Sequence, residues 1–220
     1  MPASAAARQR VLSVDVLRGA VMILMALDHT RDYFTNLRFP PENLAKATPA
    51  LFATRWVTHF CAPVFFLLAG VGASLAVSSG KSRREVSRFL LTRGLWLIVL
   101  EMTILQFAWN FSFGFPLFLL VIWALGWSMM LLSLLIFLPR WAIATIAILM
   151  IGTHNLLDPI SPDAFGTLAP LWHFLHVPGF VLGKALIGYP LIPWCGVMAL
   201  GYALGAIFDW TPGARKKLLI

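Results

Sequence analysis

Charged side chains are scarce in this chain: only 12% of its 220 residues are Asp, Glu, Lys or Arg, while 60% are apolar. A soluble globular domain has about 25% charged and about 45–50% apolar residues. The mean hydropathy of +0.82 points the same way. The shortage of charge therefore excludes a soluble domain and indicates an integral membrane protein that crosses the bilayer several times.

Acidic residues are the scarcer of the charged ones, since nine Asp and Glu stand against 17 Lys and Arg and leave a net charge of +8. In a soluble protein this excess would suggest a nucleic-acid partner. The sequence contains no nucleic-acid-binding motif and no basic helix with interleaved aromatic residues. In a membrane protein the positive-inside rule explains the excess. We therefore expect a lipid bilayer, and no nucleic acid, as a partner.

Cysteine is scarce as well. Cys61 and Cys195 both lie in apolar runs, which favours two buried thiols over a disulfide. The basic N-terminus superficially resembles a signal peptide. However, Asp15 and Arg18 interrupt the first apolar run, and no cleavage site of small residues follows it. The first apolar segment is therefore predicted to be an uncleaved membrane helix.

The predicted fold is an all-α polytopic bundle with six transmembrane spans, because a spanning helix needs about 20 mainly apolar residues. With the N-terminus in the cytoplasm, twelve Lys and Arg lie inside and five outside, so the positive-inside rule predicts this orientation. The outer loops are then 33–56, 110–114 and 159–189. The predicted spans are 12–32, 57–78, 89–109, 115–138, 141–158 and 190–209.

The chain is expected to form one transmembrane domain over residues 1–220. Its last residues, GARKKLLI, join a basic cluster to a new apolar run, as at the start of another helix, so we expect downstream helices that this chain lacks. Small residues at 69–73 and the pair Gly201-x-x-x-Gly205 predict close helix packing. Glu101 lies in the middle of the third span, where it must face the bundle interior and find a partner.

All five histidines fall on the predicted outer side, at or just beyond the same end of an apolar segment. Histidine is the side chain that moves protons most readily near neutral pH. A one-sided cluster suggests chemistry at that face of the membrane, while the alternative is that histidine is simply common at membrane interfaces. The five are His29, His59, His154, His173 and His176.

The first predicted helix is the most highly charged of the six. Arg18 and His29 are eleven residues apart. This is about 1100° around a helix, so they share one face, and they lie about 16 Å apart along the axis. Ionisable residues at membrane depth are costly and usually functional. The alternative is that these charges only stabilise the helix, through ion pairs among Asp15, Arg18, Asp28, Arg31 and Asp32.

Three stretches of the sequence together resemble a known family. They are SVDVLRGAVMILMALDHTRDYF, HFCAPVFFLLAGVGASL and YPLIPWCGVMALGYALG, in this order. The chain is similar to the heparan-alpha-glucosaminide N-acetyltransferase-like family of bacterial membrane proteins over essentially its whole length. The pattern LRGxxxxxMxxDH in the first stretch also resembles the first-helix motif of the membrane acyltransferase-3 proteins.

The resemblance implies an acyltransferase of the bacterial inner membrane that uses cytoplasmic acetyl-CoA or another acyl-CoA. The acyl group would pass to a hydroxyl or amine of a glycan or small molecule on the outer side. Arg18 matches the family arginine near the CoA side, and Arg88 and Arg93 look like the arginines that bind CoA phosphates. The planar fork of arginine suits phosphate groups. His29 matches the histidine expected at the reactive centre.

His29 is the predicted general base, with Asp28 or Asp32 orienting its ring. The sequence departs from the family at one point. The family's lysosomal enzyme uses a histidine in the stretch between its first two helices, and residues 33–57 contain none. Either His29 or His59 would have to take that role.

Polar residues at the outer ends of other spans are the predicted acceptor-binding groups. His173 and His176, with His154, also suggest a metal site, but no Cys or carboxylate spacing supports zinc, so no metal is expected. A homo-oligomer is compatible with the sequence. The predicted acceptor-binding residues are His59, His154, Asn155 and Asp158.

A proton-coupled transporter is the alternative function, because it would use the same intramembrane charges as a proton or solute path. A non-enzymatic membrane subunit, whose polar residues only pack, is a further alternative. The enzyme requires a continuous tunnel of CoA size from the arginine side to His29. The transporter requires a central cavity that opens to both faces of the membrane, and the subunit requires neither.

Overall fold

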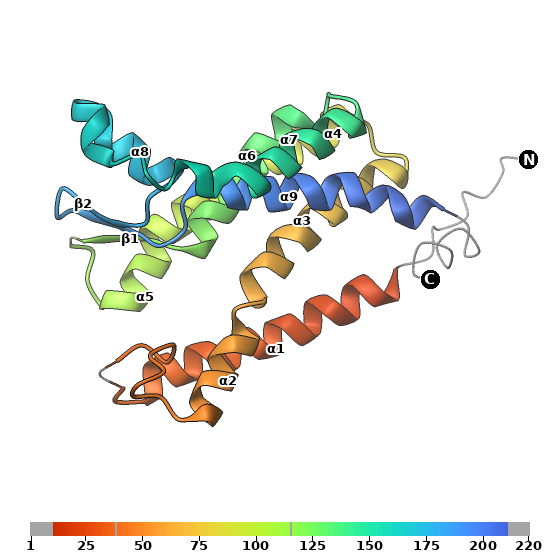
Figure 1. The fold of residues 1–220 in the computed structure, drawn as a ribbon. Coiled ribbons are helices and arrows are strands. Elements are labelled where there is room, and N and C mark those ends of the chain that lie inside the picture. The colour runs from red at the N-terminus through yellow and green to blue at the C-terminus, as the bar shows by residue number, and fades with distance from the viewer. Residues whose placement is uncertain (1–10, 38, 115, 211–220) are drawn as a thin grey trace, which may run out of the picture. The chain divides into compact units, whose positions relative to one another are not determined.

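The computed structural model describes residues 11–37, 39–114 and 116–210. The chain divides into two compact units, an N-terminal unit of residues 1–68 and a C-terminal unit of residues 69–220, and each is described by itself. Both are mainly helical, as predicted (Figure 1). Residues 211–220, which prompted the expectation of further helices, lie outside the described part of the chain.

The N-terminal unit consists of α1 (Leu12–Phe34), α2 (Pro49–Thr58) and the first half of α3 (Cys61–Ser78). Helices α1 and α2 pack against each other. The side chain of Thr48 accepts a hydrogen bond from the backbone N–H of Leu51, and Pro49 occupies the first helical position. Both features start helices. The stretch 33–56, predicted to be a loop, is therefore helical from Pro49 onward.

Helices α2 and α3 are separated by a turn at His59 and Phe60. Pro63 explains the break, because it has no N–H to donate to the carbonyl of His59 and its ring crowds that carbonyl. The apolar helical stretch thus begins eight residues before position 57, where the sequence predicted it to begin, and it bends near its start.

Four helical stretches are long and apolar enough to cross a membrane by length and composition. Helix α6 (Val121–Leu135) is apolar but has only 15 residues. The structure thus supports a polytopic membrane protein, while six spans and a cytoplasmic N-terminus stay predictions. The four stretches are Pro49–Ser78, Arg83–Trp109, Arg140–Leu157 and Leu191–Asp209.

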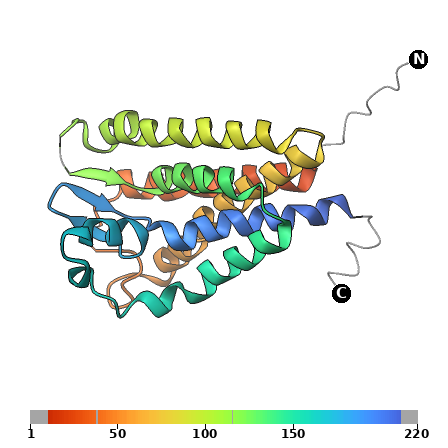
Figure 2. The same ribbon diagram turned by 90° about the horizontal axis from the view of Figure 1, so that it is seen from above.

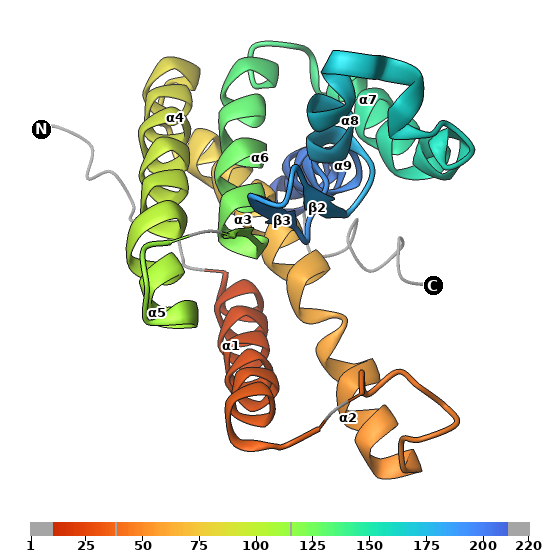
Figure 3. The ribbon, with the colours of Figure 1, turned by 90° about the vertical axis from the view of Figure 1, so that its left-hand side faces the viewer.

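Four helices of the C-terminal unit lie side by side in the order α4, α6, α9, α7 (Figure 3). Their bounds, besides α6, are α4 (Arg83–Leu100), α7 (Arg140–Thr153) and α9 (Leu191–Leu204). A capping box of Ser82 and Glu85 starts α4. The shorter elements are η1 (Glu101–Leu105), α5 (Gln106–Asn110), η2 (His154–Leu157), η3 (Pro162–Leu168), α8 (Ala169–Leu175) and η4 (Gly205–Asp209).

A small three-stranded sheet, which the sequence did not predict, lies at one end of this unit. Its strands are β1 (Leu117–Leu119), β2 (Gly179–Val181) and β3 (Ala185–Ile187), in the order β1-β3-β2. Strand β1 runs parallel to β3, and β2 runs antiparallel to it. Apolar strands of three residues are too short to show a period of two. The prediction of a spanning helix from 115 is therefore wrong over Leu117–Leu119, and α6 begins only at Val121.

Two buried polar side chains fasten the segment before α6 to the end of α4. Glu101 opens the π-helix η1 and accepts a hydrogen bond of 3.0 Å from the N–H of Leu120. The amide of Gln106 hydrogen-bonds three backbone groups between residues 114 and 118, at 2.9 to 3.1 Å. Glu101 and Gln106 are each 2% exposed. Glu101 thus faces the interior, as predicted, and its partner is a backbone group.

Glycines bring two pairs of helices into close contact. A Cβ added at Gly126 of α6 would lie 2.7 Å from the carbonyl oxygen of Gly94 on α4. A Cβ added at Gly94 would lie 2.5 Å from the carbonyl oxygen of Gly126. A Cβ added at Gly70 of α3 would lie 2.0 Å from the carbonyl oxygen of Met198, and one at Gly205 would meet Ser74. The close packing predicted for 69–73 and for Gly205 is therefore confirmed. Gly94 and Gly126 were not predicted.

Replacing Gly126 by alanine is expected to destabilise the protein by about 1–3 kcal/mol, because the added methyl group would collide with the backbone of α4. The matched control is Gly152→Ala on α7, where a Cβ meets nothing within 4 Å. Thermal unfolding in detergent measures both. Equal melting temperatures for the two variants would contradict the close approach of α4 and α6.

Candidate functional site

The carboxylate of Asp28 is the centre of a polar network in the N-terminal unit. Its oxygens accept hydrogen bonds from Arg31 at 2.5 Å, from Arg55 at 3.1 Å and from the hydroxyl of Thr58 at 2.6 Å. The Asp28 side chain is 15% exposed. Because Arg55 and Thr58 belong to α2, this carboxylate joins α1 to α2 by charge-assisted hydrogen bonds.

The network extends into the loop between α1 and α2. The Nε atom of Arg55 donates a hydrogen bond of 2.7 Å to Glu42. Partial burial alone would raise the pKa of Glu42, but the hydrogen bond and charge of Arg55 outweigh it and hold the pKa below its ordinary value. Arg31 also lies 3.1 Å from Asp32, whose side chain is 45% exposed. Arg31 therefore pairs with both acidic neighbours that the sequence suggested.

The two candidate bases adjoin this network. His29 follows Asp28 and His59 follows Thr58, so the hydrogen bond between Asp28 and Thr58 brings both histidines to one region of the unit. His29 is half-buried, with its Nδ1 atom shielded from solvent. His59 is exposed, and its Nδ1 atom lies 3.1 Å from the carbonyl oxygen of Arg55. Orientation of His29 by Asp28 or Asp32 stays a prediction.

The arginines predicted to bind CoA come from both units. In the N-terminal unit, Arg18 lies 4.0 Å from Asp15, and both side chains are nearly half exposed. In the C-terminal unit, Arg88 and Arg93 are exposed on α4. Five residues turn a helix by about 140°, so Arg88 and Arg93 point in different directions around α4. Arg88 shares its face with Arg84 instead, which lies four residues earlier.

Basic residues gather at one end of the C-terminal unit. Arg83 donates a hydrogen bond of 3.2 Å to the carbonyl of Phe137, and Arg140 lies 3.7 Å from Asp209. These contacts bring together the start of α4, the start of α7 and the segment after α9. Helix α7 then runs 14 residues, about 20 Å, to His154. The start of α4 and helix α8 lie at opposite ends of this unit (Figure 2), and so do the basic residues 81–88 and His173 that these helices carry.

At the histidine end, His176 forms an ion-pair-like contact with Asp158. Its Nε2 atom lies 2.9 Å from a carboxylate oxygen of Asp158. The His176 side chain is 4% exposed, whereas that of Asp158 is 64% exposed. The Nδ1 atom of His176 is buried and has no hydrogen-bond partner among the described residues. The pair thus combines a buried imidazole with an accessible carboxylate.

Other rings surround this pair. The ring centre of His154 lies 6.3 Å from that of His176, and the ring centre of Trp172 lies 5.3 Å from it. Phe165 stacks on Trp172 at 4.8 Å. The structure therefore brings His154 and Asp158 together as predicted acceptor-binding residues, with Asn155 exposed on the same turn.

His176 is the residue of this site that the sequence did not select for acceptor binding. The sequence places it among the five outer-side histidines and suggests it as a possible metal ligand with His154 and His173. Among residues 11–37, 39–114 and 116–210, no three His, Cys, Asp or Glu side chains are arranged to hold a metal ion. Eighteen residues separate Asp158 from His176. No helical or strand period connects two positions so far apart, so the sequence offered no signal for this pair.

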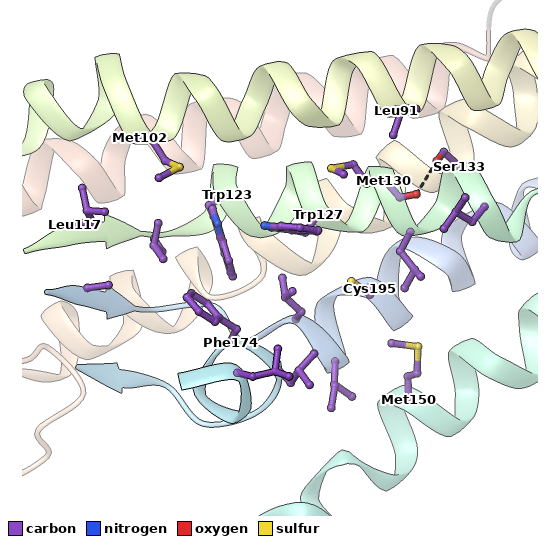
Figure 4. Close-up of a pocket in the computed structure, with 18 residues that line it drawn as sticks. Leu91, Met102, Leu117, Trp123, Trp127, Met130, Ser133, Met150, Phe174 and Cys195 are labelled. Atoms are coloured by element: carbon purple, nitrogen blue, oxygen red, sulfur yellow. Dashed lines mark hydrogen bonds between the residues drawn. The ribbon is translucent and has the colours of Figure 1, made fainter. Parts of the chain in front are cut away.

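The C-terminal unit also contains a cavity of about 660 Å³ between α4, α6, α8 and α9. Trp123, Trp127 and Phe174 form part of its wall (Figure 4). Ser133 and Cys195 contribute a hydroxyl and a thiol, and the other lining side chains are hydrocarbon, thioether or indole groups. Cys195 and Cys61 are both free and buried, which confirms the prediction of buried thiols.

Comparison with known proteins identifies the family. The family model described as "Heparan-alpha-glucosaminide N-acetyltransferase, catalytic" matches residues 10–219. No curated protein and no solved structure matches the chain. A relation to the acyltransferase-3 proteins stays a prediction. The matched family suggests a membrane acetyltransferase, and the four apolar helical stretches agree with an integral membrane protein. Because the match covers nearly the whole chain, this protein belongs to the heparan-alpha-glucosaminide N-acetyltransferase catalytic-domain family.

Proposed function

We propose that this protein transfers an acyl group, acetyl in the first instance, from a cytoplasmic acyl-CoA to a hydroxyl or amine on the outer side of a bacterial inner membrane. The observation that carries the proposal is the separation of polar groups in the C-terminal unit, with basic residues at one end and histidines at the other. Arginines suit the CoA phosphates. Histidines suit hydrogen bonding to a hydroxyl or amine of the acceptor. Family membership supports the acetyltransferase class.

The residues have separate roles in this proposal. Arg18, Arg88 and Arg93 bind the CoA phosphates from the cytoplasmic side. Since Arg88 and Arg93 point in different directions around α4, they bind different phosphate groups. The acceptor, a glycan or a small molecule, is bound by His59, His154, Asn155 and Asp158. The proposed domain has six spans and a cytoplasmic N-terminus.

The proposed reaction is a direct transfer with His29 as the base and His59 as the alternative base. The oxygen or nitrogen of the acceptor attacks the thioester carbonyl carbon, and His29 takes the proton that the acceptor loses. The new C–O or C–N bond forms, and the C–S bond breaks. The CoA thiolate then takes the proton from the imidazolium. The products are the acylated acceptor and free CoA, with Asp28 or Asp32 orienting the imidazole throughout.

The cavity of the C-terminal unit favours transfer over transport of ions or polar solutes. Paths for such solutes are lined by charged side chains or by carbonyl oxygens. The described cavity is lined almost wholly by apolar side chains. The charges of α1, which suggested a proton path, are engaged in the contacts of Asp28 with Arg31 and Arg55.

Binding of acetyl-CoA to the purified protein in detergent tests the donor side of the proposal. Arg18→Ala, Arg88→Ala and Arg93→Ala are each expected to weaken binding roughly tenfold or more, because a charge-assisted phosphate contact contributes about 1.5–3 kcal/mol. The control is Lys184→Ala, an exposed cation in the turn between β2 and β3. Isothermal titration measures all four affinities. The same affinity in all four variants would exclude these arginines as the CoA site.

A further inference from the structure

We propose that the pair of Asp158 and His176 binds the acyl acceptor, with the Nδ1 atom of His176 accepting a hydrogen bond from an O–H or N–H of that molecule. The ligand class is a small polar molecule rich in hydroxyl or amino groups, such as an amino sugar. This inference rests on the proposed acyl transfer and adds to it a residue that recognises the acceptor.

The carboxylate of Asp158 fixes the state of the His176 ring. An ionised carboxylate only accepts hydrogen bonds, so the Nε2 atom, 2.9 Å from Asp158, must carry a proton. In the neutral ring the Nδ1 atom then has a free lone pair. The ring is thereby oriented as a hydrogen-bond acceptor, as a carboxylate orients the imidazole of a catalytic triad with the two nitrogens exchanged.

Burial makes this lone pair unusual. The His176 side chain is 4% exposed, and its Nδ1 atom has no partner among the described residues. Buried polar atoms are nearly always hydrogen-bonded, because leaving one unsatisfied is costly. A histidine that served only to hold α8 against Asp158 would not need an unsatisfied Nδ1. The arrangement is explained if a ligand supplies the missing donor.

The neighbouring histidines show the contrast. The Nδ1 atom of His154 lies 2.7 Å from the carbonyl oxygen of Ile151, and that of His173 lies 3.0 Å from the carbonyl oxygen of Val177. In both, a backbone group of the protein occupies this nitrogen. Of these three histidines, only His176 has an Nδ1 atom without a hydrogen-bond partner in the described part of the chain.

The surroundings of His176 suit a small polar ligand. The rings of Trp172 and His154 lie beside it, with centres at 5.3 and 6.3 Å. Small-molecule sites are typically built from aromatic walls and a few convergent polar groups. Asp158 is 64% exposed, so the carboxylate of the pair is open to solvent.

Two variants separate recognition from folding. His176→Gln retains an N–H directed at Asp158 but removes the acceptor at the Nδ1 position. Asp158→Asn presents an amide N–H to the Nε2 atom and so moves the ring proton to Nδ1, which becomes a donor. The control is His173→Gln, on α8 and three residues before His176. All are made in the full chain in liposomes and assayed with acetyl-CoA and glucosamine.

Both site variants are expected to raise the KM for glucosamine at least about tenfold, the size of a lost buried hydrogen bond. Their affinity for acetyl-CoA is expected to equal that of the wild type, which also shows that they are folded. His173→Gln is expected to keep the wild-type KM. An unchanged KM in His176→Gln would overturn the inference.

Nitrogen NMR of histidine-labelled wild-type protein tests the same site without any transfer. The Nδ1 resonance of His176 is expected to be that of an unprotonated nitrogen and to shift when glucosamine is added. A protonated Nδ1, or no shift at saturating glucosamine, would overturn the inference. If the wild type bound glucosamine at His176 but transferred no acetyl group, the proposed function would fail and the binding site would stand.

Discussion

Replacing His29 by alanine is expected to slow acyl transfer by about 10²–10⁴-fold, the usual cost of losing a general base. Affinity for acetyl-CoA is expected to stay at the wild-type level. Arg18, the proposed phosphate ligand on the same helix, lies about 16 Å away along the axis. The measurement pairs single-turnover transfer to glucosamine with titration of acetyl-CoA.

His173→Ala is the matched control for His29→Ala. His173 lies in the C-terminal unit, on α8, and its Nδ1 atom is directed at the carbonyl of Val177. Its loss is expected to leave the rate of transfer within a few-fold of the wild type. A folded His29→Ala protein with a wild-type rate would exclude His29 as the base and would assign that role to His59.

Replacing Asp28 by alanine is expected to lower the free energy of unfolding by about 1.5–3 kcal/mol, because it removes the charge-assisted hydrogen bonds of a part-buried carboxylate. The substitution would leave the guanidinium groups of Arg31 and Arg55 without the carboxylate that both contact. Their side chains are 11% and 29% exposed, so water replaces the lost carboxylate only in part. Denaturant titration of the detergent-solubilised protein measures the change.

Asp15→Ala is the control for Asp28→Ala on the same helix. Asp15 lies 4.0 Å from Arg18, and its side chain is 46% exposed. Exposed ion pairs of this kind contribute about 0–1 kcal/mol. Equal losses of stability in the two variants would mean that the network around Asp28 does not hold α1 to α2. Asp28→Asn, which keeps the size of the side chain and removes its charge, is expected to fall between them.

Much of the helical fold follows from local sequence signals. Apolar runs predict most of the helices, but the predicted spans that begin at 57 and 89 start too late. The capping groups of α2 and α4, Thr48 with Pro49 and Ser82 with Glu85, lie before those apolar runs. The cost of a charge at membrane depth was enough to predict that Glu101 faces the interior. The ion pair between Arg31 and Asp28 could also be predicted from the sequence, because the two residues are about one helical turn apart.

The remaining features depend on contacts between distant parts of the chain. Asp28 meets Arg55 across 27 residues, and Asp158 meets His176 across 18. No period of 3.6 or 2 residues relates such positions. The three-residue strands have the same origin, since β1 exists only because β3, almost 70 residues later, lies beside it. For the candidate site, the residue types could therefore be predicted from the sequence, but the pairs of residues that contact each other could not.

The hydrogen bond between Glu101 and Leu120 constrains how this protein is made. The ribosome completes α4 before it adds Leu120, which lies nineteen residues after Glu101. Until then the N–H of Leu120, with which the carboxyl pairs in the folded protein, is not yet present, and an unpaired carboxyl in hydrocarbon is costly. Helix α4 is therefore expected to insert into the membrane poorly by itself. We expect the translocon to release α4 and α6 into the lipid as a pair, after the segment between them has folded back onto η1.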